Sequence, residues 1–356
     1  MSAHHYFPRL RWKTAEWEAL QELPVAVLTG LTPIFDFLDI DWDFPNKRYA
    51  KSLANYLNGF GSTLQSSWPL DRPVLLDVEK LDKHGTSTFH PLDTCCQDAL
   101  AHNKFVVPVY SPHYSNNYLL ALRRNNQFGV GLKLKASLLE QNQYHIDNIL
   151  LDLEIKSTDV DLIIDLEDMG VCTHQQIQQI IVISQNLLSH CTWRNVIISS
   201  TCYPTSQSGI PQHQIHLHRR EEWVLWSNVI ASNSLIRTPS FSDYPTASAK
   251  FTSVDPRHMS QYAAVRYSTN SDWIFVKGTA VKGNGWGQTQ QLCGILVGSI
   301  YYSGPTYSWG DEYINERSQG INKSGGSKEW RKVAHTHHLK MVTEQLRNFS
   351  ASYPVI

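Results

Sequence analysis

The chain contains 356 residues, of which 42% are hydrophobic and 18% are charged, and its formal net charge at pH 7 is −1. The hydrophobic content supports a large buried core, and the small charged fraction argues against a disordered chain or a coiled coil. The balanced charge argues against binding of duplex DNA through a general basic surface, because such binding needs clustered Lys and Arg to neutralise phosphates. The charge balance still allows binding through a local basic groove.

The cysteines and the apolar segments bear on the compartment. Six cysteines occur, and none belongs to a C-x-x-C pair. The first residues, MSAHHYFPRL, lack the pattern of a secretory signal, and no apolar run approaches the roughly 18 residues of a membrane-spanning helix. We therefore expect a cytoplasmic protein with reduced, mostly buried thiols and no membrane as a partner.

Strands and helices alternate through residues 6–201. An extended start at Tyr6 leads into a helix that begins near Thr14. Apolar runs then predict strands at 34–37, 74–80, 105–110, 128–134, 161–168 and 195–201. Periodicity and capping residues predict the helices between them, at 46–60, 93–103, 117–125, 136–154 and after a capping box of Thr173 and Gln176.

The rest of the chain is less regular. A segment rich in Trp and His at 211–230 is predicted to be helical, and Pro239–Tyr244 is predicted as a seventh strand. Either Ala263–Tyr267 or Trp273–Lys277 supplies the eighth strand, with a hairpin of the two as the alternative. Residues 288–350 are predicted to be mainly helical, with a Gly/Ser loop at 324–327.

The spacing of these elements predicts an α/β fold. Strands separated by helices form βαβ units and a parallel sheet. A count near eight favours a closed (β/α)8 TIM-barrel-like fold over an open doubly wound sheet. We predict one domain over residues 1–356, with a barrel core at about 30–280 and a helical C-terminal part at 288–350.

Several local signatures resemble the beta protein family, which is named after a bacteriophage T4 protein and found in phages and bacteria. The first is a Y-x-P-x-L-x-x-K-x-x-E-x-x-A-L pattern, formed here by Tyr6, Pro8, Leu10, Lys13, Glu16, Ala19 and Leu20. The others are Thr32–Phe35, Asp243-Tyr244, Arg266-Tyr267 with Trp273, Ser308–Ile314, Trp330-Arg331 and His337-His338. Where the family has F-G-D-Y, this chain has Ser242 in place of the glycine.

The resemblance covers essentially the whole chain. It implies a phage-related or bacterial accessory protein, with antiviral defence as one role. It implies no particular reaction.

Acidic residues at the ends of the predicted strands are the strongest functional signal, and they are Asp36, Asp77, Glu79, Asp165, Glu167 and Asp168. Residues i and i+2 of a strand share a face, so each D-x-E pair points one way. The strand ends of a parallel barrel converge at its C-terminal face, where paired carboxylates bind Mg²⁺ or Mn²⁺ or divide acid and base roles. The structural alternative is that these acids cap helices or form ion pairs.

Other polar residues are candidates for ligand binding. Lys133, Arg266 and Lys277 end predicted strands and suit a phosphorylated or sugar ligand, or else an internal ion-pair network. The pairs Asp243-Tyr244 and Trp309 with Asp311 suit stacking on a base or sugar, or else packing in the core. His338 is a candidate acid or base because histidine titrates near neutral pH.

Three functions stay open. The first is a metal-dependent phosphoesterase acting on a nucleotide or nucleic acid. Its metal ligands would be Asp77, Glu79, Asp165 and Glu167, and its catalytic residues would be Asp165, Glu167 and His338. Its ligand-binding residues would be Asp36, Lys133, Asp243, Tyr244, Arg266, Lys277 and Asp311. The second is a non-enzymatic component that senses a ligand or binds a protein partner encoded nearby, and the third is a glycoside hydrolase. The sequence contains no P-loop, G-x-S-x-G or H-E-x-x-H motif.

Overall fold

Eight parallel strands form the centre of the molecule in the computed structural model, which describes residues 5–140, 144–250 and 260–352. Their order in the sheet is β1-β2-β5-β6-β7-β8-β9-β11. Most are short apolar runs that are buried on both faces, as is usual for parallel strands covered by helices. The strands are β1 (Arg9–Arg11), β2 (Ile34–Asp36), β5 (Val74–Asp77), β6 (Val106–Tyr110), β7 (Val130–Lys135), β8 (Val160–Asp168), β9 (Asn195–Thr201) and β11 (Ser240–Ser242).

The two edges of this sheet meet. The backbone N–H of Phe7 donates to the carbonyl of Phe241 at 2.8 Å, and the N–H of Arg9 donates to the carbonyl of Asp243 at 2.9 Å. The sheet is therefore a nearly closed, barrel-like parallel sheet in a mixed α/β fold. Its strands run from Arg9 to Ser242, so the segment that the sequence assigned only as an extended start is the first barrel strand.

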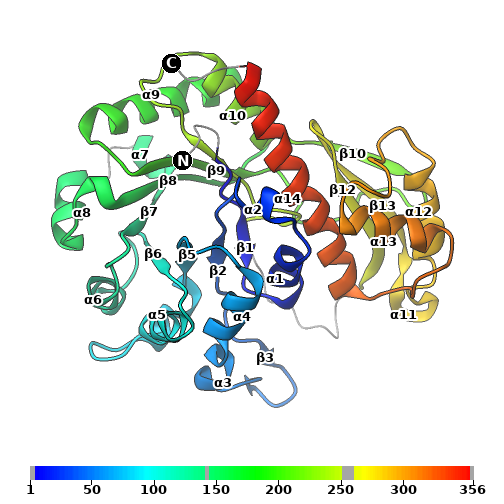
Figure 1. The fold of residues 1–356 in the computed structure, drawn as a ribbon, viewed down its shortest axis with the longest axis horizontal. Coiled ribbons are helices and arrows are strands. Elements are labelled where there is room, and N and C mark those ends of the chain that lie inside the picture. The colour runs from blue at the N-terminus through cyan, green and yellow to red at the C-terminus, as the bar shows by residue number, and fades with distance from the viewer. Residues whose placement is uncertain (1–4, 141–143, 251–259, 353–356) are drawn as a thin grey trace.

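Helices connect the strands and surround the sheet (Figure 1). The Thr173–Gln176 capping box is confirmed at the start of α9. Two 3₁₀ helices cover Glu79–His84 and Ser157–Asp159. The α-helices around the sheet are α1 (Thr14–Gln21), α2 (Val25–Leu28), α3 (Leu53–Leu57), α4 (Phe60–Ser67), α5 (Pro91–Ala101), α6 (Asn116–Arg124), α7 (Ala136–Glu140), α8 (Ile146–Leu153), α9 (His174–His190), α10 (Glu221–Ala231) and α14 (Ser327–Ser352).

A second, antiparallel sheet lies beside the barrel and has the order β10-β13-β12. It is formed by β10 (Ile215–Arg219), β12 (Tyr262–Ser268) and β13 (Asp272–Ala280), and it packs with α11 (Val281–Asn284), α12 (Thr289–Val297) and α13 (Trp309–Ser318). Helix α14 passes between the two parts, where it contacts α1 on the barrel side and β12 and α13 on the other (Figure 1).

Three expectations for the elements are wrong. The segment 211–230 contains β10 as well as α10, because Ile215-His216-Leu217 alternates with the period of a strand. The hairpin of β12 and β13 belongs to the second sheet, and β11 is the eighth barrel strand. The helix expected at 46–60 is replaced by part of a small hairpin, β3 (Trp42–Asp43) with β4 (Arg48–Tyr49), and by α3 and the start of α4.

The break between α3 and α4 has a local cause. Gly59 takes the left-handed conformation, with φ of 77°, and is the N-cap of α4. Among the described residues, no helix combines the length and the apolar composition needed to cross a membrane.

Candidate functional site

A cavity of about 380 Å³ opens at the C-terminal ends of the barrel strands. Its inner side chains come from strands β1, β2, β5, β7 and β8 and from the residues after β11. They meet because the C-terminal ends of parallel strands lie at the same end of a barrel. The inner lining residues are Arg9, Asp36, Asp77, Lys133, Asp165 and Tyr244, and the rim includes Arg11, Glu79, Lys80, His113, Lys135, Glu167 and Lys250.

Arg9 lies at the centre of the cavity and is only 3% exposed. Its Nε and Nη2 atoms donate to the two carboxylate oxygens of Asp36 at 3.0 and 2.5 Å, which is the bidentate geometry that a guanidinium favours. Nη2 also reaches Asp77 at 3.3 Å, and Nη1 lies 3.5 Å from Asp165. Burial alone would lower the pKa of Arg9, but the acidic groups around it, with Asp36 foremost, together outweigh burial and raise that pKa.

Lys133 is the second buried cation of the cavity. Its Nζ donates to Asp77 Oδ2 at 2.6 Å and to Glu79 Oε2 at 3.3 Å. The hydroxyl of Tyr114 donates to both oxygens of Asp77 at 3.0 Å. Burial would lower the pKa of Lys133, but Asp77, Glu79 and Asp36 together outweigh it and raise that pKa. Asp77 is thus held by two cations and a phenol.

The third carboxylate group of the cavity lies on β8. The Tyr244 hydroxyl donates to both oxygens of Asp165 at 3.2 Å, and the Glu167 N–H donates to Asp165 Oδ1 at 3.0 Å. Glu167 has a positive φ of 56° and extends to the rim, where it pairs with Lys135 at 3.0 Å. Asp165 and Glu167 both line the cavity.

Two carboxyl groups in this cavity have opposite pKa shifts. Burial raises the pKa of Asp36, although Arg9 acts in the opposite direction. Burial also acts to raise the pKa of Glu79, but a hydrogen bond from His113 and the charge of Lys133 outweigh it, so its pKa lies well below its usual range. Carboxyl groups with diverging pKa values in one cavity are typical of acid and base pairs.

The structure brings together part of the predicted set. Seven predicted residues line the cavity: Asp36, Asp77, Glu79, Lys133, Asp165, Glu167 and Tyr244. Five others lie elsewhere and are outside the described lining of this cavity: Asp243, Arg266, Lys277, Asp311 and His338. Arg266 is on β12 opposite Phe275, and Lys277 on β13 donates to the carbonyl of Gln207 at 2.6 Å.

His338 and Asp243 belong to a buried network between the barrel and the second sheet. His338 Nε2 donates to Asp243 at 2.9 Å, and its Nδ1 accepts from the Ser268 hydroxyl at 3.0 Å. Burial lowers the pKa of His338 to about 4, so the ring is neutral. Tyr6 donates to Asp243 at 2.6 Å, and Arg220 lies 3.7 Å from the same carboxylate. These contacts stabilise the junction of the two sheets.

Asp311 and His337 form a second buried pair in the same region. His337 Nδ1 lies 2.9 Å from Asp311 Oδ2, and Nε2 lies 2.8 Å from the carbonyl of Ser268. Both partners are acceptors, so each ring nitrogen that carries a proton can donate to one of them. The side chain of Asp311 also accepts from Tyr267 at 2.5 Å. Its role is therefore in the core.

Sequence reasoning missed Arg9, Tyr114 and His113. Arg9 was detectable in principle, because Arg9 and Arg11 flank Leu10 with the period of a strand and share one face. Tyr114 and His113 lie in the loop after β6 and had no signal of this kind.

The four proposed metal ligands are all engaged by cations. Arg9 contacts Asp77 and Asp165, Lys133 lies between Asp77 and Glu79, and Lys135 pairs with Glu167. A divalent ion between Asp77 and Glu79 would have to replace the ammonium group of Lys133. In this arrangement the inner residues fit a polar organic ligand better than a metal ion.

The fold and the cavity define a class: an α/β protein whose nearly closed parallel sheet carries an ion-paired cavity at the C-terminal ends of its strands. The chain belongs to the Beta protein family, whose model matches residues 6–344. This confirms the resemblance based on the local signatures. A search of curated proteins found no match.

Proposed function

We propose that the cavity at the barrel mouth binds a small polar ligand that carries a phosphate group and hydroxyl groups, such as a nucleotide or a sugar phosphate. The observation that carries this proposal is the central guanidinium. Arg9 Nη1 is buried and, among the described residues, has no hydrogen-bond acceptor in suitable geometry. A buried donor without an acceptor is costly, so a ligand or water that accepts from it gains free energy.

The rest of the cavity supports the same ligand class. Lys135 and Lys250 lie at its exposed rim, where cations attract a phosphate group. The carboxylates of Asp36 and Asp165 lie inside, where they accept hydrogen bonds from hydroxyl groups. A volume of about 380 Å³ suits one such small molecule.

A hydrolytic function at the same cavity is the second candidate. The presence of Asp36 and Glu79 in one cavity favours it, because hydrolysis of a phosphoester or a glycoside uses a pair of carboxyl groups. In the metal-dependent version, Asp77, Glu79, Asp165 and Glu167 would hold Mg²⁺ or Mn²⁺ after Lys133 moves away. We also infer that the barrel is of the (β/α)8 type, because at least one helix lies between each pair of successive barrel strands.

The family leads us to propose a phage-related role, with sensing of a ligand in antiviral defence as its non-enzymatic form. A nucleotide or a nucleic acid end would then be the ligand, and a protein encoded nearby would be the partner. Binding without turnover is the result that separates this form from a hydrolase.

A thermal-shift screen tests the proposal. Nucleotides, sugar phosphates, free sugars and divalent ions are screened against wild type, Lys133→Met and Glu167→Ala, with the exposed Asp71→Asn as the matched control. We expect a phosphorylated compound to raise the Tm of wild type and the control, and to lose that effect in Lys133→Met. A shift of equal size in all four proteins, or a shift by divalent ions alone, contradicts the proposal.

A further inference from the structure

A separate cluster of three different metal-ligating side chains lies on the outside of the barrel. Asp147 is in the first turn of α8, His190 is the last residue of α9, and Cys191 follows it. One ligand atom from each residue lies within 4.8 Å of the other two. Among the described residues, it is the one set of three His, Cys, Asp or Glu with this geometry.

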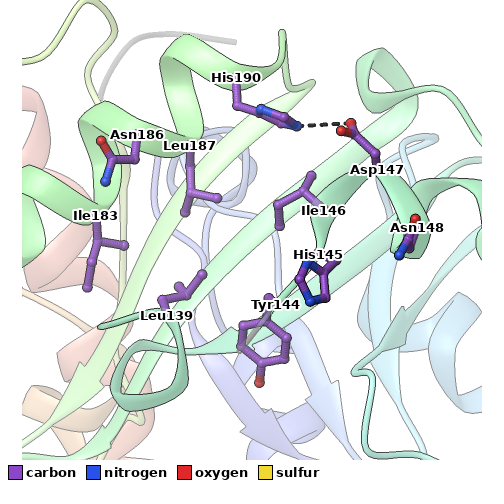
Figure 2. A pocket seen from close by; sticks show the side chains of 10 residues that line it. All are labelled: Leu139, Tyr144, His145, Ile146, Asp147, Asn148, Ile183, Asn186, Leu187 and His190. Atoms are coloured by element: carbon purple, nitrogen blue, oxygen red, sulfur yellow. Dashed lines mark hydrogen bonds and ion pairs between the residues drawn. The ribbon is translucent and has the colours of Figure 1, made fainter. Parts of the chain in front are cut away.

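Figure 2 shows His190 facing Asp147 at the edge of a cavity of about 430 Å³. The His190 Nε2 atom lies 2.9 Å from Asp147 Oδ1. Both side chains are exposed, at 44% and 80%, so they are accessible from solvent. An exposed pair of this kind contributes little to folding, so the fold does not depend on it.

We propose that Asp147, His190 and Cys191 bind a zinc ion. Thiolate, imidazole and carboxylate are the ligand types of zinc, whereas Mg²⁺ and Ca²⁺ prefer oxygen alone. Bond lengths near 2.0–2.3 Å in a tetrahedral site place ligand atoms about 3.5 Å apart. The three ligand atoms lie within 4.8 Å of one another, and rotations of the exposed Asp147 and His190 side chains bring them to that separation.

The position of the cluster also favours a cation. It lies at the C-terminus of α9, a helix of 17 residues, where unpaired carbonyl groups give a partial negative charge. On binding, the thiol of Cys191 releases its proton to solvent and the thiolate bonds to the metal. Water takes the fourth position, because the protein supplies three ligands.

The site is independent of the barrel mouth. The described linings of the two cavities have no residue in common. Ligand binding at the barrel mouth is therefore no test of the zinc site at Asp147. Loss of zinc binding at Asp147 likewise leaves the function proposed above intact.

Cobalt titration of the full, chelator-treated chain tests the site, because Co²⁺ replaces Zn²⁺ and is visible. We expect one Co²⁺ per chain, a thiolate-to-cobalt charge-transfer band, and displacement by Zn²⁺. Cys191→Ser should abolish the band, and His190→Gln and Asp147→Asn should each weaken binding at least about tenfold. Circular dichroism checks that the variants fold.

Matched controls come from the same two helices and from a second half-buried thiol. Asp152→Asn in α8, His174→Gln in α9 and Cys172→Ser should bind Co²⁺ as wild type does. A band that persists in Cys191→Ser, cobalt bound without a thiolate band, or equal affinity in all variants overturns the proposal.

Discussion

Two clusters of buried charge in this protein use the same residue types in different ways. At the barrel mouth, Arg9 and Lys133 offset carboxylates that line a cavity. At the junction of the two sheets, Arg220 lies 3.5 Å from Glu222 and 3.7 Å from Asp243, and all three side chains are fully buried. Of these two clusters, the one at the barrel mouth lines a cavity and the one at the junction does not.

Whether a cluster lines a cavity decides which role its charges can have. A charge beside a cavity can exchange its protein partner for a ligand or water, so it is available for recognition. A charge that is sealed in the interior can only stabilise the fold or destabilise it when its partner is lost. The predictions below test this distinction.

The largest effect is expected at the sealed cluster. Asp243→Ala removes the carboxylate that holds Tyr6, His338 and Arg220, and it leaves the buried charge of Arg220 with one carboxylate fewer. We expect the free energy of unfolding to fall by about 3–5 kcal/mol in urea denaturation. The exposed Asp71→Asn should change it little, and a loss below about 1 kcal/mol for Asp243→Ala would show that the cluster is not sealed.

A smaller loss of stability is expected at the barrel mouth. Lys133→Met removes one of the cations on Asp77, but the cavity admits water, and Arg9 and Tyr114 still contact this carboxylate. We expect a loss of about 1–3 kcal/mol in the same experiment. Equal losses for Lys133→Met and Asp243→Ala would remove the distinction between the clusters.

The pH dependence of stability reports on His338. Its pKa is lowered from 6.5 to about 4 in the folded protein, first because it is buried and despite Asp243. Between those pH values the unfolded chain binds the proton and the folded one does not, so the free energy of unfolding falls as the pH falls from 6.5 towards 4. We expect His338→Gln to reduce this slope by about 1.4 kcal/mol per pH unit.

The buried His5 and His335, whose pKa values burial lowers to about 3, add to the slope in both proteins. The comparison of slopes therefore isolates His338. An unchanged slope in His338→Gln would mean that this ring is protonated in the folded state.

The smallest effect on stability is expected at the rim. Lys135 pairs with Glu167 at 3.0 Å, but their side chains are 34% and 45% exposed. We expect Lys135→Met to change the free energy of unfolding by less than about 1 kcal/mol. It should still weaken binding of a phosphorylated ligand severalfold, as measured by calorimetry, and full-strength binding would exclude Lys135 from the site.

Much of the fold could be predicted from sequence because its signals are local. The apolar run before Asp165 and the capping box at Thr173 specify β8 and α9 without reference to the rest of the chain. The strand at Arg9 alternates over only three residues, and its place in the barrel depends on hydrogen bonds between Phe7 and Phe241 far along the chain. The same limit applies to β10, where alternation extends over only a few residues.

The residue types of the candidate site could be predicted from the sequence, but the contacts between them could not. Asp165 and Glu167 both line one cavity, although the positive φ of Glu167 breaks the strand alternation on which their pairing was predicted. The ion pair between Lys133 and Asp77 joins residues that are 56 positions apart in the chain, and no local sequence pattern specifies such a contact. For the same reason the sequence did not reveal that His338, a candidate acid or base, is stacked on Trp273 in the interior.

Calorimetric titration of the barrel mouth is the most direct test of the central claim. Nucleoside monophosphates and sugar phosphates are titrated into wild type, Lys133→Met and His338→Gln at low and moderate salt. We predict saturable binding to wild type that weakens with salt, is lost in Lys133→Met and persists in folded His338→Gln. Binding that is unaffected by Lys133→Met but lost in His338→Gln would contradict the account, because it would place the ligand site at the cluster described here as sealed.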